Sequence, residues 1–290
     1  MVRETQLITA LSPWDRVQLA RQAGRPHTQA YIRGLCDEFV ELHGDRMSGD
    51  DLALIGGLGR FRGRTVMIVG HQKGETTKEN IERNFGMPRP RGYRKALRLM
   101  RQAEKFYVPV LSFIDTPGAD PGLASEEGGQ AFAIADSIFT MTDLATPIIA
   151  VVIGEGGSGG ALAIGVADRV LMLENAIYSV ASPEASAAIL WKDTTRAPEA
   201  AASLRVNADD LLAFGLIDEV IREEPPAHED PAHTITVVGD AIARHLAEID
   251  EFWRPGTAGE RVLLESRYAK YRAMGRWSDS TFMVPTNGNL

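Results

Sequence analysis

The chain has 290 residues, 44% of them hydrophobic and 24% charged, and its formal net charge of −8 argues against a general nucleic-acid binder or a binder of anionic membranes. The single cysteine, Cys36, excludes an intrachain disulfide and a cysteine-based zinc site. The sequence holds neither an apolar signal-peptide core nor a stretch long enough to cross a bilayer, so we expect a cytoplasmic protein with no metal of its own.

The first part of the chain, residues 12–46, is predicted to be helical. Ser12 can cap a helix that has Pro13 at its first position. Further on, apolar side chains such as Leu35 and Phe39 recur at helical spacing. A hairpin and a helix are predicted next: strands at 52–61 and 65–72 that turn at 62–64, and a basic helix at 90–106.

From residue 108 onward, predicted strands alternate with predicted helices. The strands are 108–115, 146–154, 169–175 and a short one near 219–221, and the helices are 126–144, 158–167 and a short one after 207. This alternation indicates an α/β fold with a largely parallel sheet. A polar, proline-rich loop at 223–233 leads into a helical tail.

The segment GEGGSGGALAI, residues 154–164, directly follows an apolar strand and allows three functional interpretations. In the first, Gly154, Gly156 and Gly159 form a dinucleotide-binding fingerprint, with Glu174 as the ribose-binding acid. The predicted helix after this loop is short for such a site. A Walker-type phosphate loop is excluded because no Gly-Lys-Ser/Thr follows.

In the second interpretation Ser158 is a nucleophile, as in the Clp and signal-peptide peptidases. A serine nucleophile needs a base to accept its proton. The next histidine along the chain, His228, lies in the polar loop, so a lysine such as Lys73 or Lys192 would have to approach.

In the third interpretation the backbone alone acts. Glycines without Cβ expose N–H groups at a helix start, where they can stabilise an oxyanion. The segment IDTPGADPG, residues 114–122, follows the preceding strand and supplies a second set of donors at Gly118 and Ala119. Both loops would meet at one edge of a parallel sheet. Tight turns and close packing are the alternative explanation of the same glycines.

Several runs carry a specific family resemblance. They are HGDR (43–46), VGHQKG (69–74), NFGMPRPRGYRKALRLM (84–100), FIDTPGADPG (113–122), VVIGEGGSGGALAIGVAD (151–168), ILWKD (189–193) and LLAFGLIDEVI (211–221). In this order they resemble the carboxyltransferase alpha subunits of acetyl-CoA carboxylase, within the crotonase-like superfamily. The resemblance implies a ClpP/crotonase spiral of ββα units with helical additions at both ends. It divides the chain into a helical extension (1–46), a carboxyltransferase domain (47–222), and a polar loop with a helical tail (223–290).

The resemblance also implies a reaction in fatty acid biosynthesis. Carboxybiotin on a separate carrier protein gives its carboxyl group to acetyl-CoA, and malonyl-CoA forms. The charge that develops on the biotin ureido oxygen and on the acetyl oxygen suits fixed N–H donors. The donors expected to hold the ureido oxygen are Gly159, Gly160, Ala161, Gly118 and Ala119.

The resemblance suggests further contacts with biotin or CoA. Gly156, Gly157 and Ser158 are expected to border the biotin, and Lys73 is a candidate for CoA contact. A basic stripe at helical spacing in the predicted helix 90–106 could bind CoA phosphates or an acidic partner, or could be a solvated face. Its members with an expected role are Arg91, Arg94 and Arg98. His71 is expected to be a structural, hydrogen-bonded residue.

The implied partners are a zinc-containing beta subunit in an α2β2 assembly, the biotin carboxyl carrier protein and biotin carboxylase. Two segments depart from the family pattern. Residues 182–191 read SPEASAAILW where the family usually has SPEGCASILW, and Asp120 replaces an aromatic residue in TPGAYPG. These changes leave open a related acyl-CoA carboxylase component.

Overall fold

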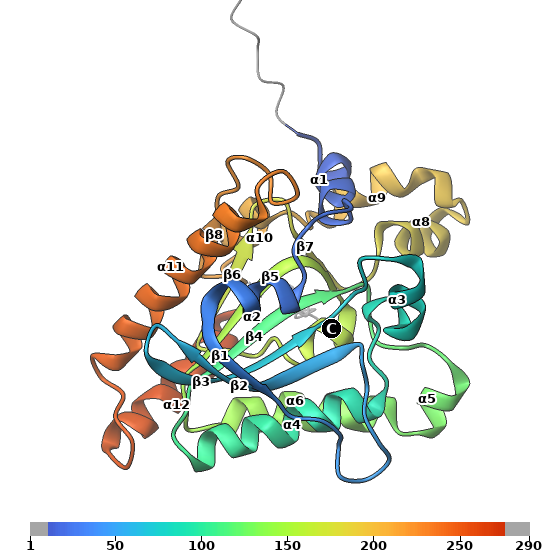
Figure 1. Ribbon diagram of the computed structural model, residues 1–290. Coiled ribbons are helices and arrows are strands. Elements are labelled where there is room, and N and C mark those ends of the chain that lie inside the picture. Colours follow the sequence, from blue (N-terminus) through green and yellow to red (C-terminus); the bar gives the residue numbers. More distant parts are fainter. Residues whose placement is uncertain (1–10, 276–290) are drawn as a thin grey trace, which may run out of the picture.

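The computed structural model describes residues 11–275, which form one mixed α/β unit built around an eight-stranded sheet (Figure 1). The strands are β1 (Cys36–Glu41), β2 (Leu54–Phe61), β3 (Arg64–His71), β4 (Val110–Thr116), β5 (Ile148–Gly157), β6 (Arg169–Leu173), β7 (Ile177–Ser179) and β8 (Glu219–Ile221).

The helices cover the sheet and its ends. They are α1 (Pro13–Ala20), α2 (Thr28–Leu35), α3 (Thr77–Glu82), η1 (Asn84–Gly86), α4 (Pro90–Lys105), α5 (Leu123–Glu127), α6 (Gln130–Asp143), α7 (Ser158–Leu162), α8 (Pro183–Trp191), η2 (Thr194–Arg196), α9 (Ala197–Leu204), α10 (Ala208–Ala213), α11 (Pro231–Asp250) and α12 (Ala258–Ala273).

The sheet runs in the order β1-β2-β3-β4-β5-β6-β8, and β7 pairs with the end of β5. The first three strands are antiparallel, whereas β3 to β8 pair in parallel, which confirms the predicted α/β class. Helix α4 packs on one face, where Gly56 approaches Leu99, and α2 packs on the other, where Gly70 approaches Thr28. Strands β4 and β5 are consequently buried on both faces.

The predicted hairpin is confirmed. Phe61 pairs with Arg64, and the two residues between them, Arg62 and Gly63, have φ values of 49° and 79°. Positive φ at both central positions is typical of the type I′ turn that joins twisted strands. The cap at Ser12 is also confirmed, because its side chain accepts a hydrogen bond from the Asp15 N–H.

Three secondary-structure predictions are wrong in part. The predicted helix 158–167 ends at Leu162, where α7 ends. Residues 36–41 form β1 rather than helix, because pairing with β2 buries Phe39 in part against the core and overrides the helical spacing. The predicted helix 126–144 is interrupted, because Gly129 adopts φ +83° and separates α5 from α6. Helices α3, α8 and α9, the short helices η1 and η2, and strand β7 were not predicted. The division into three segments stays a prediction, and residues 1–10 and 276–290 lie outside the described part.

Candidate active site

Two glycine-rich turns lie at neighbouring strand ends. The first turn, residues 117–119, follows β4, and the second turn, residues 156–161, spans the end of β5 and the start of α7. The strands pair in parallel, with Thr116 opposite Gly156. Because the carboxyl ends of adjacent parallel strands share one edge of the sheet, both turns lie at that edge, as the sequence predicted.

The backbones of the two turns are in direct contact. A Cβ atom added to Gly157 would lie 2.1 Å from the carbonyl oxygen of Pro117, and one added to Gly160 would lie 2.4 Å from the amide nitrogen of Ala119. Real Cβ atoms do not approach backbone atoms so closely. Packing alone therefore requires glycine at positions 157 and 160, whatever else these residues do.

Two other glycines leave space beside the backbone. At Gly118, which has φ +156°, nothing lies within 4 Å of the Cβ position. At Gly159 the nearest atom is Cγ2 of Ile134, at an ordinary 3.6 Å. The turns are thus closed towards each other but open at these two positions, where a flat ligand could approach the backbone.

Backbone donors are available in both turns. The first N–H groups of an α-helix have no partner within the helix, and in α7 these belong to the residues that start at Ser158. The Gly118 N–H donates to Thr116 Oγ1 at 3.1 Å, whereas the Ala119 N–H has no acceptor among residues 11–275. Of the two predicted donors in the first turn, Ala119 is therefore the available one.

Charged side chains lie directly beneath both turns. Lys73 Nζ, just after β3, lies 2.7 Å from Asp115 Oδ1 at the end of β4 and 2.9 Å from Glu155 Oε2 near the end of β5. His27 Nδ1 lies 2.6 Å from Asp115 Oδ2, and Arg21 Nε donates to Glu155 Oε1 at 2.7 Å. We call these five residues the charge cluster. It ties α1 and α2 to the ends of three parallel strands.

Burial and pairing oppose each other in this cluster. Burial works against the charged forms, but the two carboxylates outweigh it and raise the pKa of Lys73. Likewise, burial would raise the pKa of Asp115, but Lys73 and His27 hold it well below its usual range. The Lys73 ammonium and the Asp115 carboxylate are both charged at neutral pH and satisfy each other.

Two polar groups beneath the second turn have no partner among the described residues. They are His71 Nε2 and the Tyr93 hydroxyl, both fully buried. His71 Nδ1 accepts from the Asp115 N–H at 3.4 Å, and burial lowers the pKa of His71 to about 4. A Cβ at Gly160 would lie 3.0 Å from the Tyr93 hydroxyl. His71 is hydrogen-bonded, as predicted, and neutral.

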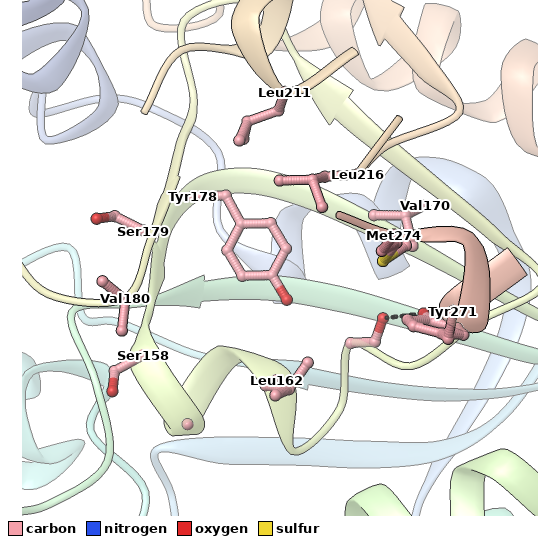
Figure 2. A pocket seen from close by; sticks show the side chains of 12 residues that line it. Ser158, Leu162, Val170, Tyr178, Ser179, Val180, Leu211, Leu216, Tyr271 and Met274 are labelled. Carbon is pink, nitrogen blue, oxygen red and sulfur yellow. Dashed lines mark hydrogen bonds between the residues drawn. The ribbon is translucent and has the colours of Figure 1, made fainter. Parts of the chain in front are cut away.

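A cavity of about 380 Å³ adjoins the second turn (Figure 2). It extends from Ser158 and Leu162 on α7 to the C-terminal helix α12, and its lining is mostly apolar. The lining residues are Ser158, Gly159, Leu162, Gly165, Val170, Tyr178, Ser179, Val180, Leu211, Leu216, Tyr271 and Met274. Because it borders the exposed side of Gly159, an apolar group could lie in it while a polar atom faces the turn.

The basic stripe of α4 contacts the loop of residues 43–50 instead of open solvent. Arg94 Nε donates to Asp45 Oδ2 at 2.9 Å, and Arg98 Nε donates to the Gly44 carbonyl at 3.1 Å. Asp45 also accepts hydrogen bonds from three backbone N–H groups of its own loop. These contacts favour a structural role for Arg94 and Arg98, and their predicted role in CoA binding, with that of Arg91, stays a prediction.

The two segments that depart from the family pattern are held in place. The Asp120 carboxylate accepts from Ser125 Oγ on α5 at 2.6 Å and lies 3.6 Å from Arg89 Nε at the start of α4, so Arg89 balances its charge. In the segment 182–191, Glu184 accepts from Arg21 Nη1 at 2.5 Å, which links α8 to the charge cluster.

The first two interpretations of the glycine segment find no support in the geometry. Glu174, the expected ribose ligand, pairs with Arg16 and Arg222, and α7 has only five residues. The Ser158 hydroxyl is exposed and makes no hydrogen bond to a base within residues 11–275. Of its two candidate lysines, Lys73 is held by carboxylates.

Most of the charge cluster was not predicted from the sequence. Lys73 follows a buried strand, and Asp115 and Glu155 lie near the ends of two others. Because parallel strands end at the same edge of a sheet, this position could have indicated that the three side chains lie close together. Arg21 and His27 carried no such signal, because the region was assigned to one continuous helical segment.

Among the described residues, no helix is long and apolar enough to span a membrane, and no group of acidic, histidine or cysteine side chains is arranged to hold a metal.

Residues 2–275 match the family described as acetyl co-enzyme A carboxylase carboxyltransferase-like. Two similar relatives carry the name acetyl-coenzyme A carboxylase carboxyl transferase subunit alpha. The protein of Prochlorococcus marinus (strain MIT 9303) is 52% identical over 96% of this chain and 83% of its own, and that of Synechococcus sp. (strain CC9902) is 51% identical over the same shares.

Solved carboxylase and transcarboxylase structures share the fold. A transcarboxylase 12S structure matches 80% of this chain with a TM-score of 0.62 and 21% identity, and the beta subunit of geranyl-CoA carboxylase from P. aeruginosa matches 81% with a TM-score of 0.59 and 16% identity. The matched part is only 44% and 45% of those chains, so this chain spans less than half of their length.

Proposed function

Because the chain belongs to the family of acetyl-CoA carboxylase carboxyltransferase alpha subunits, we propose that its two glycine turns form the biotin half of a carboxyltransferase site. The family's enzymes are transferases of fatty acid biosynthesis. The substrates proposed here are carboxybiotin on a carrier protein and acetyl-CoA, with malonyl-CoA as the product. The observation that supports the proposal is the direct contact between the two turns, which follow the neighbouring parallel strands β4 and β5.

The residues present fit a biotin ureido group. The open Cβ positions at Gly118 and Gly159 leave room for a flat ring system, and the adjoining cavity can take its apolar part. The bound carboxybiotin supplies the carboxyl group. The N–H groups at the start of α7 and of Ala119 would donate to the ureido oxygen. Gly157 allows the two turns to lie close together, and Gly156 leaves room for the Tyr178 ring.

Such donors act by being fixed before the reaction. Each N–H aimed at developing negative charge typically lowers the barrier by about 3 to 4 kcal/mol. The missing Cβ atoms at Gly157 and Gly160 let the two turns approach each other closely, so that donors of both turns can face one ligand. Of the basic side chains beneath the turns in residues 11–275, His71 is buried and neutral and Lys73 is bound by two carboxylates, so neither is free to act as a base.

The surface around the second turn supports a protein partner. Large apolar side chains are exposed there on three helices and on the segment before α8. They are Leu123 on α5, Phe132 and Phe139 on α6, Val180 before α8, and Ile189 and Leu190 on α8. An exposed apolar surface of this kind is typical of an interface. We propose that the zinc-containing beta subunit covers it in an α2β2 assembly and brings the acyl-CoA, with the biotin carboxyl carrier protein and biotin carboxylase completing the enzyme.

The test is the reverse reaction in a mixture of this chain and the beta subunit of the same organism. We expect malonyl-CoA-dependent carboxylation of biocytin only when both chains are present. Turnover by this chain alone, or a stable two-chain complex without any turnover, would contradict the proposed division of the site. A serine-directed fluorophosphonate should leave Ser158 unlabelled.

A further inference from the structure

We infer that Lys73 is a positioning residue that holds both glycine turns in one arrangement by bridging Asp115 and Glu155. This inference rests on the function proposed above, and it gives Lys73 a different task from the CoA contact that the resemblance suggested. It follows from where the three residues lie along their strands.

The two carboxylates sit immediately before the turns. Asp115 is one residue short of the end of β4, and Glu155 is two residues short of the end of β5. Any shift of these side chains is therefore transmitted through one or two residues of backbone to Pro117 or Gly157, the first point at which the turns touch. One nitrogen, Lys73 Nζ, contacts both carboxylates.

The backbone adds a second link between the same residues. The Glu155 N–H donates to Asp115 Oδ1 at 3.1 Å, the oxygen that also accepts from Lys73. A Cβ at Gly154 would lie 2.4 Å from this oxygen. The Asp115 carboxylate thus lies against the backbone of β5, and Lys73 neutralises it there.

Lys73 itself is fixed and largely shielded. Its side chain is 14% exposed, and those of Asp115 and Glu155 are 3% and 10% exposed. Its stem packs against the turn of η1, since a Cβ at Gly86 would lie 2.7 Å from Lys73 Cγ. An ammonium bound by two buried carboxylates and packed along its stem is not free to reach a phosphate in solvent.

Without the ammonium, two adjacent buried carboxylates would repel each other. Arg21 and His27 would each still face one of them, but neither contacts both. Removing one partner of a buried ion pair leaves an uncompensated charge, and relief comes from movement or protonation. Either response loosens the strand ends that carry the donors, and a small misplacement of donors can cost about 100-fold in rate.

The experiment compares Lys73→Met, Lys73→Arg and Lys270→Met in the complex with the beta subunit. Lys270 is the matched control, because its side chain is 16% exposed and its Nζ pairs with Asp218 Oδ2 at 2.5 Å, between α12 and the start of β8. Two readouts are taken: kcat and KM for malonyl-CoA with biocytin as acceptor, and hydrogen–deuterium exchange of amides in residues 117–122 and 156–161.

We expect Lys73→Met to lower kcat by about 30- to 100-fold with KM for malonyl-CoA within about twofold, and to speed exchange in both segments together. Lys73→Arg keeps a positive charge between the carboxylates and should restore most of the kcat. Lys270→Met should change neither kcat nor exchange in these segments.

Two results would overturn the inference: a raised KM for malonyl-CoA with kcat intact, which indicates a CoA contact, or unchanged exchange in either turn of Lys73→Met. The failure of the proposed function looks different. In that case the wild-type complex itself shows no carboxylation, while the exchange experiment still decides whether Lys73 holds the turns.

Discussion

Two regions stand out in the sequence: the strand edge with the glycine turns and the basic stripe of α4. They differ in whether the structure gives them the neighbours that the sequence led us to expect. At the strand edge, the expected neighbours meet: the two turns touch, and open backbone positions remain at Gly118 and Gly159. On α4, the expected ligand-binding arginines contact the 43–50 loop, where Arg94 and Arg98 are engaged by Asp45 and Gly44.

The difference lies in what each pattern specifies. A glycine turn after a buried parallel strand has its place fixed by the sheet, because adjacent strands end at the same edge. A basic helix face predicts only that its side chains will contact carboxylate or carbonyl oxygens. Those oxygens can come from a ligand or from any segment of the chain. The following predictions test this contrast, starting with the largest effect.

Replacing Gly160 by alanine should abolish most of the activity, whereas the same change at Gly159 should be far milder. The Gly160 Cβ would collide with the Ala119 nitrogen at 2.4 Å and force the turns apart, whereas the Gly159 Cβ meets only Ile134 at 3.6 Å. We expect kcat to fall 100-fold or more for Gly160→Ala, on the order of a lost oxyanion donor. For Gly159→Ala, whose methyl group would enter the space proposed for the ring system, we expect kcat to fall about threefold or less and KM for biocytin to rise. Biocytin carboxylation in the two-chain complex measures both.

Equal losses for the two alanine variants would mean that side-chain volume near α7, rather than contact between the turns, decides the activity. Circular dichroism and partner binding serve as the controls for folding.

The next effect concerns stability and its dependence on pH. Burial lowers the pKa of His71 to about 4 from 6.5, so the folded chain binds fewer protons than the unfolded chain between these values. His71 therefore contributes stability that is fully present above pH 6.5 and is lost as the pH falls towards 4. The shift corresponds to about 3 kcal/mol between pH 7 and pH 4.

His71→Gln removes the titrating group while keeping an acceptor for the Asp115 N–H. Urea unfolding at several pH values measures the free energy of unfolding. Between pH 7 and pH 4, this free energy should fall by about 3 kcal/mol less in the variant than in the wild type. Parallel curves for the two proteins would show that His71 does not titrate on unfolding.

A smaller effect tests the face of α4. Arg94→Met leaves Asp45 with its three backbone donors but removes the ion pair, which should cost about 1 to 2 kcal/mol of stability. If Arg94 serves the loop, KM for malonyl-CoA should stay within about twofold. If KM for malonyl-CoA instead rises about tenfold while stability stays normal, Arg94 contributes to CoA binding, as its spacing suggested.

Much of the fold was predictable, because hydrophobic alternation, the Arg62-Gly63 turn and the Ser12 cap are local signals. The failure at β1 arose because strand pairing with a distant segment overrode local helical spacing. In the site, the turns were predictable from their strands. The charge cluster was not, because its partners come from four separate segments whose meeting point only the folded chain defines.

The smallest expected effect belongs to Ser158, the residue on which the hydrolase interpretation depended. Ser158 has φ +53°, a conformation that disfavours side chains and favours glycine, and its exposed hydroxyl makes no hydrogen bond within residues 11–275. Ser158→Gly should therefore keep the backbone donors and change stability by about 1 kcal/mol or less, with relief of strain offset by the entropy of glycine. Carboxylation should remain within about threefold of the wild type, because the proposed donors are N–H groups that both residues possess. A loss of about 10⁶-fold, the order seen when a serine nucleophile is removed, would instead assign the chemistry to the hydroxyl and overturn the backbone mechanism.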